Sequence, residues 1–175
     1  AAVEHPKIPG LFLLTAPARP HGRPVTEIQM ADLLREVRRR FDFCLLDAPA
    51  GLGRGFQLAT CAADRCVVVT TADASSLRDA QHTVMELDRF PSGALHLVVN
   101  RVRKKLLRQL HATIDDAIDK AGLPLLGVVP EDDALPLCMN RGVPILLADG
   151  QSAATAYRNI AKRLQGERVP LLRIR

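Results

Sequence analysis

A carboxylate followed by a glycine-rich turn is the first feature of this sequence that could take part in chemistry. Residues 41–55 read FDFCLLDAPAGLGRG, so that Asp47 directly follows a short apolar run and Gly51 comes four residues later. Such a carboxylate can hold Mg²⁺ directly or through water, and glycine lets backbone N–H groups approach a phosphate closely. The alternative is an ordinary strand-to-helix loop in which Asp47 caps the helix. This stretch alone favours neither interpretation.

Polar residues also follow two later apolar runs. Asn100 and Arg101 come after Leu95–Val99, and the tripeptide Pro130-Glu131-Asp132 comes after Leu125–Val129. An asparagine side chain donates and accepts hydrogen bonds at once, so it can read an adenine edge with two of them. An acidic loop stiffened by proline can close over the base.

Each of these strand-end groups has a simpler explanation. Asn100 would satisfy loop backbone, and Glu131 with Asp132 would cap the helix that follows. Ligands gather outside the carboxyl ends of parallel strands, however, and all of these groups occupy such ends. We therefore expect the groups to converge on one ligand.

Strand and helix signals alternate along the chain, which predicts a parallel sheet covered on both faces. Apolar runs of strand length occur at Leu11–Leu14, Phe41–Leu46, Cys66–Thr71, Leu95–Val99 and Leu125–Val129. Helical patterns follow Thr26 and cover Phe56–Ala63, Leu77–Phe90, Ile114–Ala121, Asp133–Met139 and Ala153–Leu164. The fold predicted is a doubly wound, mostly parallel α/β protein, with residues 1–175 forming a single domain.

Several element boundaries are marked by capping signals. Thr26 with Gln29 forms a capping-box pattern, and Thr113 and Gly122 bracket a helix. Ser75 and Ser76 are the candidate N-caps of the helix that begins at Leu77. Two further segments are also assigned. Arg103–Leu110 is predicted as either a helix or a mobile loop, and Val143–Leu147 is predicted as extended.

Composition excludes several classes of protein. Aromatic residues make up 3% of the chain and there is no Trp, so a nucleic-acid platform of stacked aromatic rings is not expected. The net charge of +5 allows anionic partners, but the densest basic run, residues 101–105, is typical of a solvated surface, so DNA is not an expected partner. No signal peptide or membrane-spanning run is present, and the expected location is the cytoplasm.

Taken in order, the motifs resemble those of a known family. They are DAPAG with GLGRGF at 47–56, VVVTT with SSLRDA at 67–80, NRV at 100–102, IDDAI at 114–118, PLLGVVPED at 124–132, NRGVP at 140–144, and AYRNIAKRL with GERVPL at 156–171. This order and spacing resemble the MinD/ParA family of deviant Walker A ATPases, and especially its MinD branch, which determines the division septum site. The resemblance runs from near residue 11 to the end of the chain.

The resemblance implies roles for particular residues. Asp47 would order Mg²⁺ through water, and Gly51 would lie near the terminal phosphate of ATP. The adenine side of the nucleotide would be bound by Asn100, Arg101, Pro130, Glu131 and Asp132. The helix start carrying Ser75, Arg78 and Asp79 would meet regulators of the MinC or MinE kind; the alternative is an exposed helix start with locally paired charges. Family members also form ATP-dependent dimers, so a self-dimer is expected of the parent protein.

The sequence also departs from the family pattern. A phosphate loop of the KGGxGKT type is absent from these 175 residues, and the resemblance covers the C-terminal two thirds of the family domain. In the family, the strand before that loop lies between the strands expected here at Phe41–Leu46 and Cys66–Thr71. Without the loop, ATP and Mg²⁺ binding is expected to be weak or absent, and this chain alone is predicted not to hydrolyse ATP.

The tail through Arg175 carries no amphipathic helix, so membrane attachment is not expected of this chain. The parent protein is expected in the cytoplasm or peripherally at the inner membrane. Two other functions remain open. One is a non-catalytic scaffold that keeps the ATPase surface for a partner. The other is a ParA-type partitioning or flagellar-number ATPase, whose grip on DNA would depend on salt through Arg101, Arg103, Lys104 and Lys105.

Overall fold

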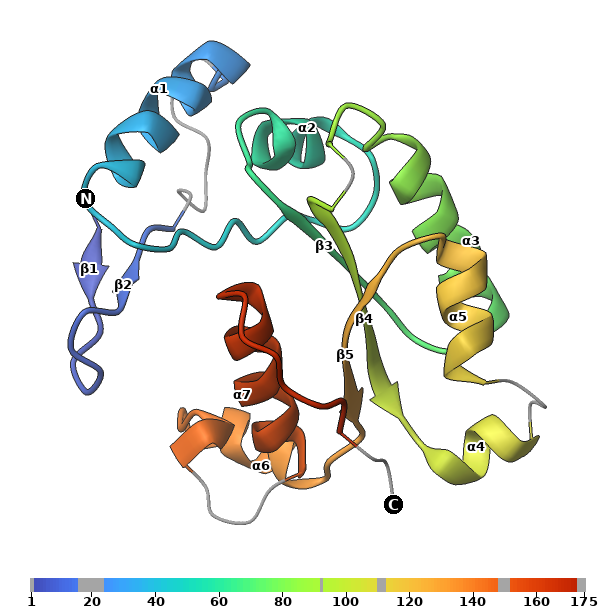
Figure 1. Ribbon diagram of the computed structural model, residues 1–175. Coiled ribbons are helices and arrows are strands. Elements are labelled where there is room, and N and C mark those ends of the chain that lie inside the picture. Colours follow the sequence, from blue (N-terminus) through green and yellow to red (C-terminus); the bar gives the residue numbers. More distant parts are fainter. Residues whose placement is uncertain (1, 16–23, 92, 110–112, 148–151, 173–175) are drawn as a thin grey trace. The chain divides into compact units, whose positions relative to one another are not determined.

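The computed structural model describes residues 2–15, 24–91, 93–109, 113–147 and 152–172 (Figure 1). The chain divides into two compact units, Ala1–Leu46 and Asp47–Arg175. The second unit contains the parallel sheet and most of the helices.

The first unit holds a small hairpin and one helix. Strands β1 (Val3–Glu4) and β2 (Phe12–Leu13) pair antiparallel, with Val3 opposite Leu13. The strand expected near residue 12 therefore forms, but it belongs to a hairpin and not to the parallel sheet. None of the described residues of this unit is fully buried, so its apolar side chains gain little stabilisation within the unit itself.

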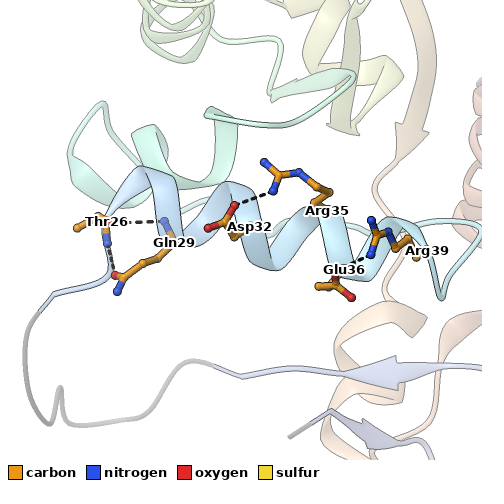
Figure 2. Close-up of polar contacts among 6 residues, drawn as sticks. All are labelled: Thr26, Gln29, Asp32, Arg35, Glu36 and Arg39. Carbon is orange, nitrogen blue, oxygen red and sulfur yellow. Dashed lines mark hydrogen bonds and ion pairs between the residues drawn. The ribbon is translucent and has the colours of Figure 1, made fainter.

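Helix α1 (Glu27–Arg38) begins as its sequence predicts. The Thr26 hydroxyl accepts the Gln29 N–H at 3.2 Å, and the Gln29 side chain accepts the Thr26 N–H at 3.0 Å (Figure 2). Ion pairs one turn apart follow, between Asp32 and Arg35 and between Glu36 and Arg39. These pairs are exposed and contribute only tenths of a kcal/mol each, about 0.3–0.5. The capping box is therefore the feature that fixes where α1 starts.

The strand predicted at Phe41–Leu46 does not form. Residues 41–46 have no regular structure, and the side chains of Phe43 and Leu45 are 66% and 88% exposed. Phe41 and Leu46 are half-buried, and the Phe41 ring packs edge-on against Phe12 with the ring centroids 5.2 Å apart. An apolar run becomes a strand only when a neighbouring strand satisfies its backbone groups, and no strand in the described part of the chain pairs with this one.

The second unit alternates helices with strands. Its elements in chain order are α2 (Arg54–Thr60), β3 (Cys66–Thr70), α3 (Ala74–Met85), β4 (Leu95–Val102), α4 (Lys104–Gln109), α5 (Ile114–Ala121), β5 (Leu125–Pro130), α6 (Ala134–Asn140), the 3₁₀ turn η1 (Ile145–Leu147) and α7 (Ser152–Leu164). None of these helices, nor α1, has the length and apolar character needed to cross a bilayer, so far as the described residues extend.

Three parallel strands in the order β3-β4-β5 make the sheet (Figure 1). Val68 pairs with Leu97, and Leu97 pairs in turn with Leu125. Helices α3 and α5 cover one face, where Leu77, Ala117 and Ala121 pack against the strands. The predicted doubly wound α/β fold is therefore confirmed.

Helix α7 covers the opposite face over β5. Ala153, Ala154 and Ala156 of α7 are almost completely buried against Val98 and Leu126. The Arg163 guanidinium donates to the backbone oxygen of Leu126 at 2.8 Å, which occupies a carbonyl at that end of β5.

Strand β3 is less buried than its sequence predicts. Val68 and Thr70 face the α3 side and are buried, but Val67 and Val69 on the other side are 37% and 60% exposed. The other edge of β3 pairs with no strand in the described parts of the chain. An uninterrupted run of β-branched residues predicts a strand that is buried on both faces. Whether both faces are buried depends on which helices pack against the strand.

Some boundaries also differ from those predicted. Helix α3 starts at Ala74 and is capped by Asp73, not by Ser75 or Ser76. The segment predicted as extended near residue 145 forms the 3₁₀ turn η1. The segment Arg103–Leu110, predicted as either a helix or a mobile loop, contains the helix α4, and Leu110 lies outside the described residues. Thr113 and Gly122 cap α5 as expected, Gly122 in the left-handed conformation at φ 66°.

Candidate functional site

The carboxyl ends of β4 and β5 form one continuous structure. Val102 pairs with Pro130, and the Glu131 N–H donates to the Val102 oxygen at 3.1 Å. Between Val99 and Val102 the register shifts, which leaves Asn100 and Arg101 as a bulge in β4. A bulge changes the direction of the side chains it carries, and bulges occur often beside functional sites.

The bulge places Arg101 in an uncommon backbone conformation. Its φ is 53°, and it is the one residue other than glycine with positive φ in the described part of the chain. The Asn100 side-chain oxygen accepts the Arg101 N–H at 2.9 Å, which stabilises this turn. The Asn100 amide nitrogen donates to no group of the described residues. In the bulge, the side-chain oxygen of Asn100 is therefore engaged by the backbone, while its two amide N–H groups remain available to a ligand.

Glu131 forms ion pairs with two arginines, Arg101 in β4 and Arg103 directly after it. Its carboxylate accepts from Arg101 Nη2 at 3.2 Å and, through its other oxygen, from Arg103 Nε. The Glu131 side chain is 20% exposed, whereas those of Arg101 and Arg103 are 68% and 60% exposed. The hydrogen bond from Arg103, together with that from Arg101, lowers the pKa of Glu131 below its ordinary value. The group is therefore a carboxylate with both oxygens occupied, flanked by two exposed cations.

Asp132 has a different environment from its neighbour. One carboxylate oxygen accepts the Ala134 N–H and the other accepts the Ala153 N–H, both at 3.1 Å. Asp132 therefore links the first turns of α6 and α7. The capping explanation considered for Glu131 and Asp132 applies to Asp132, while Glu131 forms ion pairs.

The loop that carries Asp47 and Gly51 precedes α2. Asp47 is exposed, and Gly51 takes φ 85°, a conformation that a residue with a Cβ adopts only at a cost. Within the described residues there is no cluster of three or more His, Cys, Asp or Glu side chains that could hold a metal ion. A single exposed carboxylate suits Mg²⁺ held mainly by water and phosphate oxygens, which is how proteins commonly bind that ion.

A second polar cluster follows β3, at the start of α3. The Asp73 carboxylate accepts the Ser76 N–H at 3.0 Å and the Ser75 hydroxyl at 2.7 Å, and the Thr71 hydroxyl also donates to it. The hydrogen bond from Thr71, followed by that from the Ser76 N–H, lowers the pKa of Asp73. Ser75 is therefore part of the cap, while Arg78 and Asp79 are exposed on the first turns of α3.

Removal of the Asp73 carboxylate should destabilise α3. We expect Asp73→Ala to lower the free energy of unfolding by about 1 kcal/mol, because the helix loses its N-cap. Asp73→Asn retains a capping oxygen and should lose less. Since the pKa is lowered in the folded state, the charge of Asp73 contributes above its ordinary value of 3.8, and that contribution disappears as the pH falls through the lowered value.

Urea titrations of wild type, Asp73→Ala and Asp73→Asn at pH 7 and pH 3 measure these differences. The exposed Asp79→Ala, on the same helix, serves as the control and should change the free energy little. If the wild type exceeded Asp73→Asn in free energy of unfolding by more at pH 3 than at pH 7, the assignment of a lowered pKa to Asp73 would be wrong.

The structure thus brings together part of the predicted site. Asn100, Arg101, Pro130 and Glu131 meet at one end of the sheet, as the strand-end argument requires. Arg103 was absent from the predicted nucleotide site, and the sequence indicated it only as a possible DNA contact in the basic run 101–105. Asp73 was also missed, because the neighbouring serines offered an equally good capping signal.

This architecture is the α/β fold that P-loop ATPases share, and solved structures of that class superpose on it. A MinC:MinD cell division protein complex of Aquifex aeolicus contains a chain that superposes with a TM-score of 0.80 at 29% identity, covering 86% of this chain and 63% of that one. The cell division ATPase MinD of Pyrococcus furiosus superposes with a TM-score of 0.68 at 25% identity, covering 81% and 59%.

Sequence comparison gives the family. The septum site-determining protein MinD of Synechocystis is 32% identical over 175 residues, which cover 98% of this chain and 65% of that protein. A family model described as cellulose biosynthesis protein BcsQ matches residues 19–163. The chain belongs to the MinD/ParA family, and it spans just under two thirds of the length of this Synechocystis relative.

Proposed function

We propose that this chain forms the adenine-binding side of a MinD-like ATPase that helps to place the cell-division site. The observation that carries the proposal is the bulge at the end of β4, which leaves the Asn100 amide donors available beside Pro130 and Glu131. An open amide at the carboxyl end of a parallel strand fits the edge of an adenine base.

The remaining parts of the proposal rest on family membership. Asp47 would order Mg²⁺ through water, Gly51 would lie beside the terminal phosphate, and Asp132 would support the base-binding loop. ATP would drive self-association of the parent protein in the cytoplasm or at the inner membrane, and Ser75, Arg78 and Asp79 would contact a MinC-like or MinE-like regulator. This chain alone would bind nucleotide only weakly and would not hydrolyse it, because its 175 residues contain no phosphate loop.

Calorimetric titration of the chain with ATP and Mg²⁺ tests the proposal. We expect measurable binding by the wild type and a loss of about tenfold or more in Asn100→Ala, since a two-hydrogen-bond contact with a base is worth about 1–3 kcal/mol. Asn140→Ala, at an exposed asparagine that ends α6, is the matched control and should bind like the wild type.

Two results would contradict the proposal. A folded chain that binds no nucleotide would instead favour a scaffold that keeps the family surface for a protein partner. Equal binding by wild type and Asn100→Ala would place the nucleotide elsewhere. Circular dichroism on each variant establishes that the chain compared is folded.

A further inference from the structure

Glu131, Arg101 and Arg103 form an ion-pair group at the ends of β4 and β5. Each carboxylate oxygen of Glu131 is engaged by a guanidinium group, Oε1 by Arg101 and Oε2 by Arg103. Its backbone N–H is fixed as well, by the Val102 oxygen. Glu131 is therefore anchored to the ladder between β4 and β5, and its side chain acts on Arg101 and Arg103.

Arg101 is the group whose position this anchoring determines. Its backbone is held at φ 53° by the bulge, and Glu131 binds its guanidinium, yet its side chain remains 68% exposed. Long side chains at the surface ordinarily sample many rotamers, and ordering one of them costs conformational entropy. A cation held in place while exposed to solvent is thus arranged in advance for a ligand.

The composition of the site indicates what the guanidinium would contact. Bases bound by proteins commonly stack on a planar group, either an aromatic ring or the guanidinium of an arginine. The chain has no Trp, and its single tyrosine, Tyr157, lies on α7 and packs against the core there. The phenylalanines of the 47–175 unit, Phe56 and Phe90, also pack against the core. At the end of β4 the planar group next to Asn100 is Arg101.

We propose that Glu131, supported by Arg103, is a positioning residue that holds the Arg101 guanidinium for stacking on the base whose edge Asn100 contacts. This inference rests on the proposed adenine-nucleotide site and goes beyond it by assigning Glu131 a role away from the ligand. Arg103 shares the carboxylate, so its removal leaves Glu131 free to shift.

Titrations with adenosine and with ADP separate base stacking from phosphate contact. We expect Arg101→Ala to weaken both ligands by a similar factor, about tenfold, because both carry the same base. Arg101→Lys keeps the charge but loses the planar group, so it should not restore adenosine binding. A loss confined to ADP would show that Arg101 contacts phosphate and would overturn the stacking assignment. Arg141→Ala, at an exposed arginine that caps α6, is the control for net charge.

A double-mutant cycle tests the positioning role of Glu131. Glu131→Gln should weaken adenosine binding severalfold in the wild-type background and have little further effect in Arg101→Ala, because it acts through that arginine. An equal loss in both backgrounds would mean that Glu131 contacts the ligand directly, and would overturn the inference.

A measurement on the ligand-free protein completes the test. The Nε–H of Arg103 should exchange slowly with water in NMR spectra of the wild type and rapidly in Glu131→Gln. Rapid exchange in the wild type would contradict the ion-pair group itself. If the wild type binds neither adenosine nor ADP, the proposed function fails as well. If it binds both and only Asn100→Ala weakens binding, the role of Glu131 and Arg101 fails alone.

Discussion

Leu97→Ala should lower the free energy of unfolding of the 47–175 unit by about 3 kcal/mol, and the loss could reach about 5 kcal/mol if the site does not collapse. Leu97 lies in the central strand β4 and is 0% exposed, with Val68 of β3 beside it in the register of the sheet. Truncation removes buried methyl groups and leaves a cavity between the sheet and the helices α3 and α5.

The matched control for this substitution is Leu137→Ala. Leu137 lies on α6 and is 57% exposed, and alanine is well tolerated within a helix. Chemical denaturation of both variants, followed by circular dichroism, should show a large change for Leu97→Ala and a change within about 0.5 kcal/mol for Leu137→Ala. Similar losses for both leucines would mean that the core around β4 is packed differently from the structure described here.

Gly127→Ala should be the second strongly destabilising substitution, at about 1–3 kcal/mol. Gly127 is buried in β5, and a Cβ at this position would lie 2.9 Å from Cδ1 of Ile160 and closer still to its Cγ1. Ile160 belongs to α7, so the extra methyl group forces the Ile160 side chain, or the helix that carries it, to shift. The restriction comes from space and not from the backbone, because Gly127 does not have positive φ.

This explanation predicts that the effect depends on Ile160. Ile160→Ala removes both clashing atoms, so Gly127→Ala should cost much less in that background than in the wild type. Gly53→Ala is a control, since nothing lies within 4 Å of its added Cβ and its φ is −73°. Gly53 is the N-cap of α2, so alanine has a small cost there, and that cost should not depend on Ile160. Equal costs of Gly127→Ala in both backgrounds, measured by urea denaturation, would rule out the clash.

The candidate site illustrates how far local sequence reasoning extends. The sequence predicted that Asn100 and the Pro130-Glu131-Asp132 loop would meet, and they do, because adjacent parallel strands end at the same edge of a sheet. It could not predict that Glu131 would bind two arginines while Asp132 would receive two helix N–H groups. Those partners lie 2 to 30 residues away, and only the folded chain determines which carboxylate reaches which donor.

The sequence by itself determined the features that depend on neighbouring residues. These are the alternation of strands β3, β4 and β5 with helices, the capping box at Thr26, and the stop of α5 at Gly122. At the two helix ends the energy comes from hydrogen bonds and backbone preferences within a few residues, so the local pattern suffices. The alternation of strands and helices follows from the spacing of apolar residues along the chain.

The tertiary structure decided the features that need a partner distant in sequence. Phe41–Leu46 and Cys66–Thr70 are both short apolar runs, yet only the second is a strand, because β4 pairs with it. Even there, Val68 is buried and Val69 is not, since helices cover only one face of β3. Strand pairing and burial are interactions between segments. An apolar run shows that a segment can pair and be buried, but it does not specify which other segment will be its partner.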